Sequence, residues 1–147
     1  MSIKVLKAGF QDLIQDMGRF GNTHMGISAS GAADNIAFRI GNLLLDNDIN
    51  APGIEITLFG GSYYFNKDAI IVLSGSDFSS TIDGKIISFY KPLSVKTGQT
   101  LSISQTTDGA RCYLCIKGGF QVPLVLNSRS THVLSKIGGL NGRSLEK

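Results

Sequence analysis

The sequence has no tryptophan and only two cysteines and two histidines among its 147 residues. This scarcity leaves few ligands for a metal site, because a tetrahedral zinc centre needs four ligands on matched turns. Charged residues make up 17% of the chain, and a hydrophobic content of 42% is typical of a folded protein rather than a disordered one. A chain of this length has room for one domain with its own core. We therefore expect a single domain over residues 1–147.

Clustered positive charge and long apolar runs are also absent. The net charge of +3 comes from basic residues that are scattered along the chain, which gives little support for nucleic-acid binding. No apolar run reaches the length of a membrane span, and residues 1–10 lack the hydrophobic segment of a signal peptide. These features predict a cytoplasmic protein with neither a nucleic-acid partner nor a membrane partner.

The cysteines Cys112 and Cys115 form a C-x-x-C pattern within a run that is typical of a buried strand. Residues three apart in a strand point to opposite faces of the sheet, so these two side chains would not converge on one ligand. A free cysteine is most often a small buried hydrophobe. We interpret both as core thiols and predict no metal site.

Most of the chain has the alternating hydrophobicity and turn signals of short strands. An Asp83-Gly84 pair between two such runs is a strong hairpin signal. The predicted strands are 3–7, 13–14, 54–58, 63–65, 69–73, 79–82, 86–89, 93–95, 101–104 and 112–116. The exception is the segment at about 33–45, where apolar residues recur at helical spacing. The pattern predicts a mainly β fold, a closed or nearly closed antiparallel β-barrel with one main α-helix.

The start of this helix is a candidate anion site. Ser30 or Asp34 can cap the helix, since each offers a side-chain oxygen to the unpaired amides of the first turn. The small residues between them let a ligand approach those amides, where the helix dipole favours negative charge. An ordinary capped turn is the other interpretation, and the local sequence leaves both open.

Other polar side chains lie in loops bounded by glycine. Arg19 follows Gly18, Ser76 and Asp77 follow a predicted buried strand, and Arg129 is flanked by serines. An arginine in such a loop could hold a carboxylate, a carbamate or a phosphate by a bidentate contact. It could equally tie its own loop together by donating to backbone carbonyls, and the sequence alone leaves both interpretations open.

These loops together resemble the N-terminal half of the biotin-dependent carboxyltransferase-like family. That family includes the C subunit of 5-oxoprolinase, the Kip-inhibitor antagonist, allophanate hydrolase subunit 2 and the carboxyltransferase part of urea amidolyase. The similar motifs, in family order, are Gln15-Asp-x-Gly-Arg19, Ser30-Gly-Ala-x-Asp34, Asn42 with Leu43-Leu-x-x-Asn47, Leu58-x-Gly-Gly61, Ser74-Gly-x-Asp-Phe78, Gly118-Gly119, and Ser128-Arg-Ser-Thr131 followed by Gly138-Gly139. The resemblance implies a cyclophilin-like β-barrel. Because family members continue well beyond the position of Lys147, we expect a truncated product or a separate domain, in which a site between halves or subunits would be incomplete.

The resemblance implies three functional interpretations. In the first, the chain resembles the C subunit of an ATP-dependent 5-oxoprolinase, which opens 5-oxoproline to glutamate with the help of an A subunit plus a related B subunit. In the second, it is the carboxyltransferase component of a biotin-dependent urea or amide carboxylase. In the third, it is a non-enzymatic antagonist that binds a Kip-type kinase inhibitor. No Walker-type P-loop motif occurs, so ATP would be held in another way, together with the partner subunits.

We expect the polar loops to line one site for a small amide substrate in the complete protein. The two arginines would bind an anionic group, the serines and nearby amides would orient it, and an aspartate would act as acid or base or support an arginine. On this hypothesis this chain alone is inactive. The candidate residues are Arg19, Ser30, Gly31, Ser76 and Arg129 for binding, and Asp34 and Asp77 for catalysis.

Overall fold

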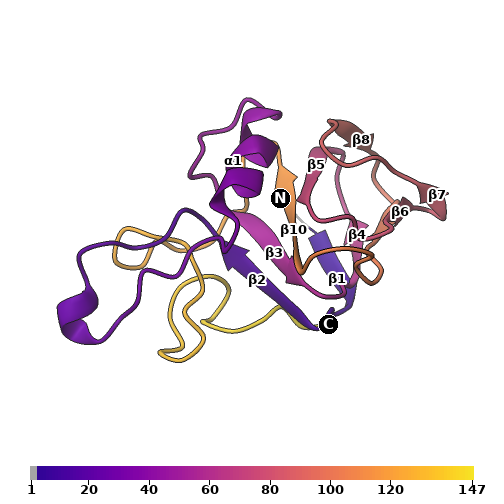
Figure 1. Cartoon of the computed structure of the whole chain (residues 1–147). Coiled ribbons are helices and arrows are strands. Elements are labelled where there is room, and N and C mark those ends of the chain that lie inside the picture. Colours follow the sequence, from indigo (N-terminus) through magenta and orange to yellow (C-terminus); the bar gives the residue numbers. More distant parts are fainter. Residues whose placement is uncertain (1–2) are drawn as a thin grey trace.

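The computed structural model describes residues 3–147, which form strands, one α-helix and long loops (Figure 1). The strands are β1 (Ile3–Lys7), β2 (Gln11–Gln15), β3 (Gly53–Thr57), β4 (Ser62–Phe65), β5 (Ala69–Gly75), β6 (Thr81–Ile82), β7 (Lys85–Ile86), β8 (Leu93–Val95), β9 (Thr100–Ser102) and β10 (Arg111–Ile116). The helices are α1 (Asn35–Leu43) and a short 3₁₀-helix η1 (Thr23–Met25). No helix within residues 3–147 combines the length and the apolar character that crossing a bilayer requires.

The strands form two five-stranded antiparallel sheets. The first sheet has the order β1-β4-β9-β6-β7, and the second sheet has the order β2-β3-β10-β5-β8. The predicted hairpin at Asp83-Gly84 joins β6 to β7, and both residues have the positive φ that a tight turn of this kind requires. The predicted fold class, mainly β and antiparallel with one helix, is confirmed.

One core lies between the two sheets. Tyr63 and Leu101 reach it from the first sheet, and Ile56, Leu73 and Leu114 reach it from the second, all fully buried. Ile56 lies in a run that alternates in sequence, whereas Leu73 and Leu114 lie in runs that are apolar throughout because both faces of β5 and β10 are buried. Burial of these apolar side chains is the main stabilising contribution in a fold with so little helix.

The cysteines lie on opposite faces of β10, as predicted. Cys112 packs in the core between the sheets, whereas Cys115 packs with Phe38 of α1 on the outer face of the second sheet. Both thiols are buried and free. They are therefore components of two different hydrophobic clusters.

Helix α1 packs on the outer face of the second sheet, over β5 and β10 (Figure 1). Gly41 allows the close approach, because a Cβ there would lie 2.7 Å from Ser74 Oγ and 2.8 Å from Cys115 Sγ. Asp34 caps the helix, with its Oδ1 accepting from the Ala37 amide at 3.0 Å. The helix therefore covers the β5 and β10 part of the second sheet.

Candidate functional site

A buried carboxylate, Asp16, joins two loops at the end of β2. Its Oδ1 accepts hydrogen bonds from the Ser128 hydroxyl at 2.7 Å, the Ser130 hydroxyl at 2.5 Å and the Gly18 amide at 2.8 Å. Its Oδ2 accepts from the Arg129 amide at 2.6 Å. Burial by itself raises the pKa of Asp16, but these hydrogen bonds together outweigh it and lower that pKa. The ionised carboxylate is thus the fixed point around which residues 16–19 and 128–130 are arranged.

Arg19 is 1% exposed and binds backbone carbonyls. Its Nε donates to the Val125 carbonyl at 3.3 Å, and its Nη2 donates to the Ser130 carbonyl at 2.6 Å. Burial lowers its pKa, and the charge of Asp16 raises it in part. Of the three side-chain nitrogens of Arg19, only Nη1 has no hydrogen-bond partner within residues 3–147. In this structure Arg19 ties the loops together, which is the second of the two roles that the sequence left open.

Arg129 is less buried than Arg19 and lines a polar pocket of about 360 Å³. Its Nε donates to the Val122 carbonyl at 3.2 Å, and the terminal nitrogens form no hydrogen bond with the described part of the chain. Asp48, Asn50 and Gln121 are among the other residues that line this pocket. Because Asp16 contacts the loops of both arginines, Arg19 and Arg129 lie at the same end of the molecule.

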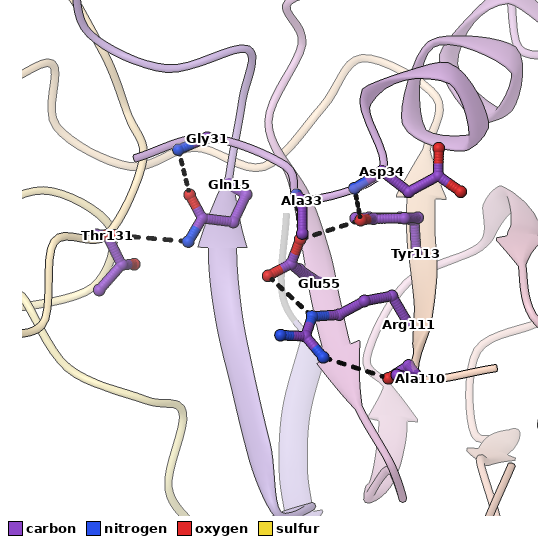
Figure 2. A network of polar contacts seen from close by, with 9 residues as sticks. All are labelled: Gln15, Gly31, Ala33, Asp34, Glu55, Ala110, Arg111, Tyr113 and Thr131. Carbon is purple, nitrogen blue, oxygen red and sulfur yellow. Dashed lines mark hydrogen bonds and ion pairs between the residues drawn. The ribbon is translucent and has the colours of Figure 1, made fainter. Parts of the chain in front are cut away.

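The loop before α1 lies tightly against residues 16–19. The Gly31 amide donates to Gln15 Oε1 at 3.1 Å, and Gln15 Nε2 donates to the Thr131 carbonyl at 3.3 Å (Figure 2). Gly31 has a φ of +87°, and a Cβ there would lie 2.8 Å from the Gly18 amide nitrogen. Ser30 also has a positive φ, and its buried hydroxyl has no partner within the described residues.

A second carboxylate, Glu55 of β3, binds the start of α1. Glu55 is 6% exposed, and its Oε2 accepts from the Ala33 amide at 2.7 Å and from the Tyr113 hydroxyl at 2.9 Å (Figure 2). The same hydroxyl accepts from the Asp34 amide at 2.7 Å. Arg111 Nε lies 3.6 Å from Glu55 Oε1. Negative charge is therefore already present at the helix start, where it occupies amides that the sequence suggested for a ligand.

The two residues after β5 lie at the edge of this network. The Ser76 amide donates to the Arg111 carbonyl at 2.8 Å, which places Ser76 beside the Glu55 group. Asp77 is exposed, and its Oδ1 accepts from the Ser79 amide at 3.0 Å within its own loop. Of the predicted site residues, the network includes Arg19, Gly31, Asp34 and Arg129, and Ser30 lies between Arg19 and Gly31. Ser76 lies at the border of the network, and Asp77 lies outside it.

Sequence reasoning did not select Asp16, Glu55, Arg111 or Tyr113 as site residues. Asp16 was present in a recognised motif, and its position beside Gly18 and Arg19 was the available signal. Glu55 and Tyr113 become partners because they pair directly across β3 and β10. No pattern within either strand indicates that pairing.

The chain is similar to known proteins along almost its whole length. A family model described as the carboxyltransferase domain, subdomain A and B, matches residues 25–147. Urea amidolyase of Saccharomyces cerevisiae is 42% identical over 146 residues, which cover 99% of this chain and 8% of that protein. The 5-oxoprolinase C subunit of Haemophilus influenzae is 40% identical over 144 residues, which cover 98% of this chain and 47% of that protein.

Solved structures agree with these similarities. The urea amidolyase of K. lactis matches with a TM-score of 0.96 and 39% identity, over 98% of this chain and 9% of that one. The urea carboxylase of Kluyveromyces lactis has the same TM-score and identity over 13% of its length. The chain spans about half the length of the 5-oxoprolinase relative and a small part of the urea amidolyases.

Proposed function

Because this chain belongs to the carboxyltransferase domain family, subdomain A and B, we propose that it is a component of an ATP-dependent 5-oxoprolinase, equivalent to part of the C subunit. The observation that carries the proposal is the free end of the Arg129 guanidinium in a polar pocket. 5-Oxoproline has a carboxylate next to its lactam ring, and a guanidinium binds such a group with two parallel hydrogen bonds. The relatives named as the C subunit of 5-oxoprolinase support this substrate.

The proposed reaction is the opening of the lactam to glutamate. ATP activates the lactam carbonyl as a phosphorylated species, and water then opens the ring. In this scheme Arg129 holds the substrate carboxylate, while Asp16 and Arg19 fix the loop that carries it. Backbone amides and a guanidinium at the site also stabilise the negative charge that develops on the carbonyl oxygen.

Ser30 and Ser76 are the candidates for orienting the substrate, whereas the Gly31 amide already donates to Gln15 Oε1. The exposed carboxylates Asp34 and Asp77 are the candidate acid or base. Asp34 lies beside the Glu55 group, which favours it over Asp77. We propose that two partners, an A subunit plus a related B subunit, complete the site and hold ATP with this chain, in the cytoplasm.

A second function is favoured by the similarity to urea amidolyase, which is 42% identical to this chain. In that case the chain is the carboxyltransferase component of a biotin-dependent urea or amide carboxylase. Urea has no carboxylate, so Arg129 would then hold the carboxyl group that is transferred. The two functions therefore assign the same side chain to different groups.

The test is co-expression of the gene that encodes this chain with homologues of the B and A subunits, followed by assay of ATP-dependent glutamate release from 5-oxoproline. Arg129→Gln is expected to raise the KM for 5-oxoproline by about tenfold or more, with a smaller effect for Arg129→Lys, which keeps the charge. Lys85→Gln, at an exposed basic residue on β7, is the matched control.

The outcomes separate the interpretations. Glutamate release without biotin supports the 5-oxoprolinase function. Activity on urea or an amide only with a carboxybiotin donor supports the carboxyltransferase function. Partner binding without turnover of either substrate contradicts both and agrees with the antagonist interpretation.

A further inference from the structure

We propose that the loops at one end of the molecule form a docking surface for a partner protein whose own face has apolar side chains surrounded by carboxylates. We define the arm surface as the exposed apolar side chains Phe20, Met25, Leu124, Leu126 and Leu134. The inference rests on the proposed function for the choice of partner, which is the B subunit. The surface itself is argued from burial, loop geometry and charge.

The first loop, residues 19–29, extends away from the sheets (Figure 1). It is closed at its base by a hydrogen bond of 2.7 Å from the Arg19 amide to the Ala29 carbonyl. A Cβ added at Gly21 or Gly26 would meet nothing within 4 Å, and η1 at the tip has no buried residue. Phe20 nevertheless lies in this loop with 76% of its surface exposed. One exposed apolar side chain is ordinary, but several on neighbouring loops favour an interaction site.

The second part comes from two turns in residues 122–137. A bridge between Val125 and Ser128 and another between His132 and Ile137 close these turns. Leu124 and Leu134 are exposed on them, Leu134 almost completely. In Figure 1 these turns extend on the same side of the second sheet as the first loop.

Buried polar contacts join the two parts at their base. Arg19 Nε donates to the Val125 carbonyl, and Phe20 and Asn127 line one pocket of about 450 Å³. The four hydrogen bonds to Asp16 fix the same loops from below. Exposed apolar groups on a frame that is already ordered lose little conformational entropy when they bind, which is the condition for a strong contact.

The charge of these segments indicates the kind of partner. All eleven Asp and Glu residues of the chain lie outside segments 17–33 and 118–145, whereas the half-buried Arg129 and the exposed Lys136 and Arg143 lie inside them. Within the described chain Arg143 pairs with Glu146, and Lys136 has no ion pair. A partner with carboxylates around its apolar face is attracted to such a surface. A second copy of this chain would bring like charges together, which argues against self-association.

The probe for the test is the purified homologue of the B subunit, and isothermal titration calorimetry is the measurement. Leu124→Glu and Leu134→Glu place a carboxylate on the arm surface without affecting a buried side chain. Each is expected to weaken binding by about tenfold or more. Ile86→Glu is the matched control, because Ile86 is 88% exposed on β7, at the opposite side of the molecule (Figure 1). This variant should bind the B subunit with wild-type affinity. Lys136→Glu should also weaken binding and reduce its dependence on salt.

Several results would overturn the docking surface. They are wild-type affinity in both leucine variants, absence of a complex with the B subunit, binding to phosphatidylglycerol vesicles in place of the protein, or self-association that the same variants abolish. The proposed function fails separately. A complex that depends on the arm surface but releases no glutamate supports the docking surface and contradicts the 5-oxoprolinase function. A complex that releases glutamate and is unaffected by the leucine variants supports the 5-oxoprolinase function and contradicts the docking surface.

Discussion

The Tyr113 hydroxyl donates a hydrogen bond to the Glu55 carboxylate at 2.9 Å and accepts one from the Asp34 amide at 2.7 Å. This single oxygen connects β10, β3 and the start of α1. Burial, and next the charge of Glu55, raise the pKa of Tyr113, so the hydroxyl stays protonated and able to donate. The helix start is therefore held by side chains of the sheet rather than left open to an anion.

Tyr113→Phe should destabilise the protein by about 1–2 kcal/mol, because it leaves the Asp34 amide without an acceptor and removes a donor from Glu55. Urea unfolding followed by circular dichroism measures the effect. Tyr64→Phe is the control, since the Tyr64 hydroxyl has no hydrogen bond within the described residues, and it should be nearly neutral. Equal stability of the two variants would show that the Tyr113 hydroxyl does not hold the helix start.

Asp16→Asn should cost about 2–3 kcal/mol at neutral pH, since a buried ionised acceptor of four hydrogen bonds is lost. The folded-state pKa of Asp16 is lowered, so its contribution is complete above the ordinary aspartate pKa and is lost as the pH falls through the folded-state value. The difference between wild type and variant should therefore be constant near neutrality and shrink below about pH 4. Unfolding curves at a series of pH values test this, and a difference that persists in acid would contradict it.

The pKa of Asp12 is shifted in the opposite direction to that of Asp16. Burial raises its pKa, in spite of the hydrogen bonds from the Tyr63 hydroxyl and the Gly9 amide. The folded state therefore binds the proton more tightly than the unfolded state, and stability from this group is lost as the pH rises above about 4 towards the raised value. The stability of wild type relative to Asp12→Asn should fall over that range. A constant difference would show that Asp12 titrates normally.

The two arginines should separate stability from ligand binding. Arg19→Met removes the donors to the carbonyls of Val125 and Ser130 and should cost about 2–3 kcal/mol of stability. Arg129→Gln should change the unfolding midpoint much less, because the end of its guanidinium is unpaired, and should act instead on 5-oxoproline binding. Denaturation of both variants, compared with their KM values, tests the division. A large loss of stability in Arg129→Gln alone would reverse the roles.

The strands could be predicted from sequence because each one alternates between buried and exposed positions or is apolar throughout. The run 54–58 and the strand β3 coincide to within one residue, and the helix was identified from its spacing. The expected strand at 86–89 is shorter, because β7 ends at Ile86 and a single further hydrogen bond, from the Ile87 amide to the Ser80 carbonyl, follows in line with the β6–β7 pairing.

The site was predictable only in part, for a physical reason. The glycine-bounded loops indicated where polar groups gather, and Arg19 and Arg129 do lie at one end. Glu55 is a polar residue at an alternate position of a strand, which in sequence is typical of a solvent-facing side chain. Its burial depends on the loop before α1 folding over it, and that contact joins residues 22 positions apart.

The cysteines should be unreactive in the folded protein. Burial raises the pKa of Cys115 to about 12 and that of Cys112 well above its ordinary value, so neither forms a thiolate near pH 8. Alkylation by iodoacetamide must then wait for opening of β10, which is a central strand of the second sheet. We expect modification about 100-fold slower than that of the cysteine in Ile86→Cys, whose position is 88% exposed, and rapid modification of all thiols in urea. Mass spectrometry gives both rates and should find two free thiols without reductant. Native labelling of Cys112 or Cys115 at the rate of the exposed position would contradict their assignment to the two hydrophobic clusters and reopen a redox role.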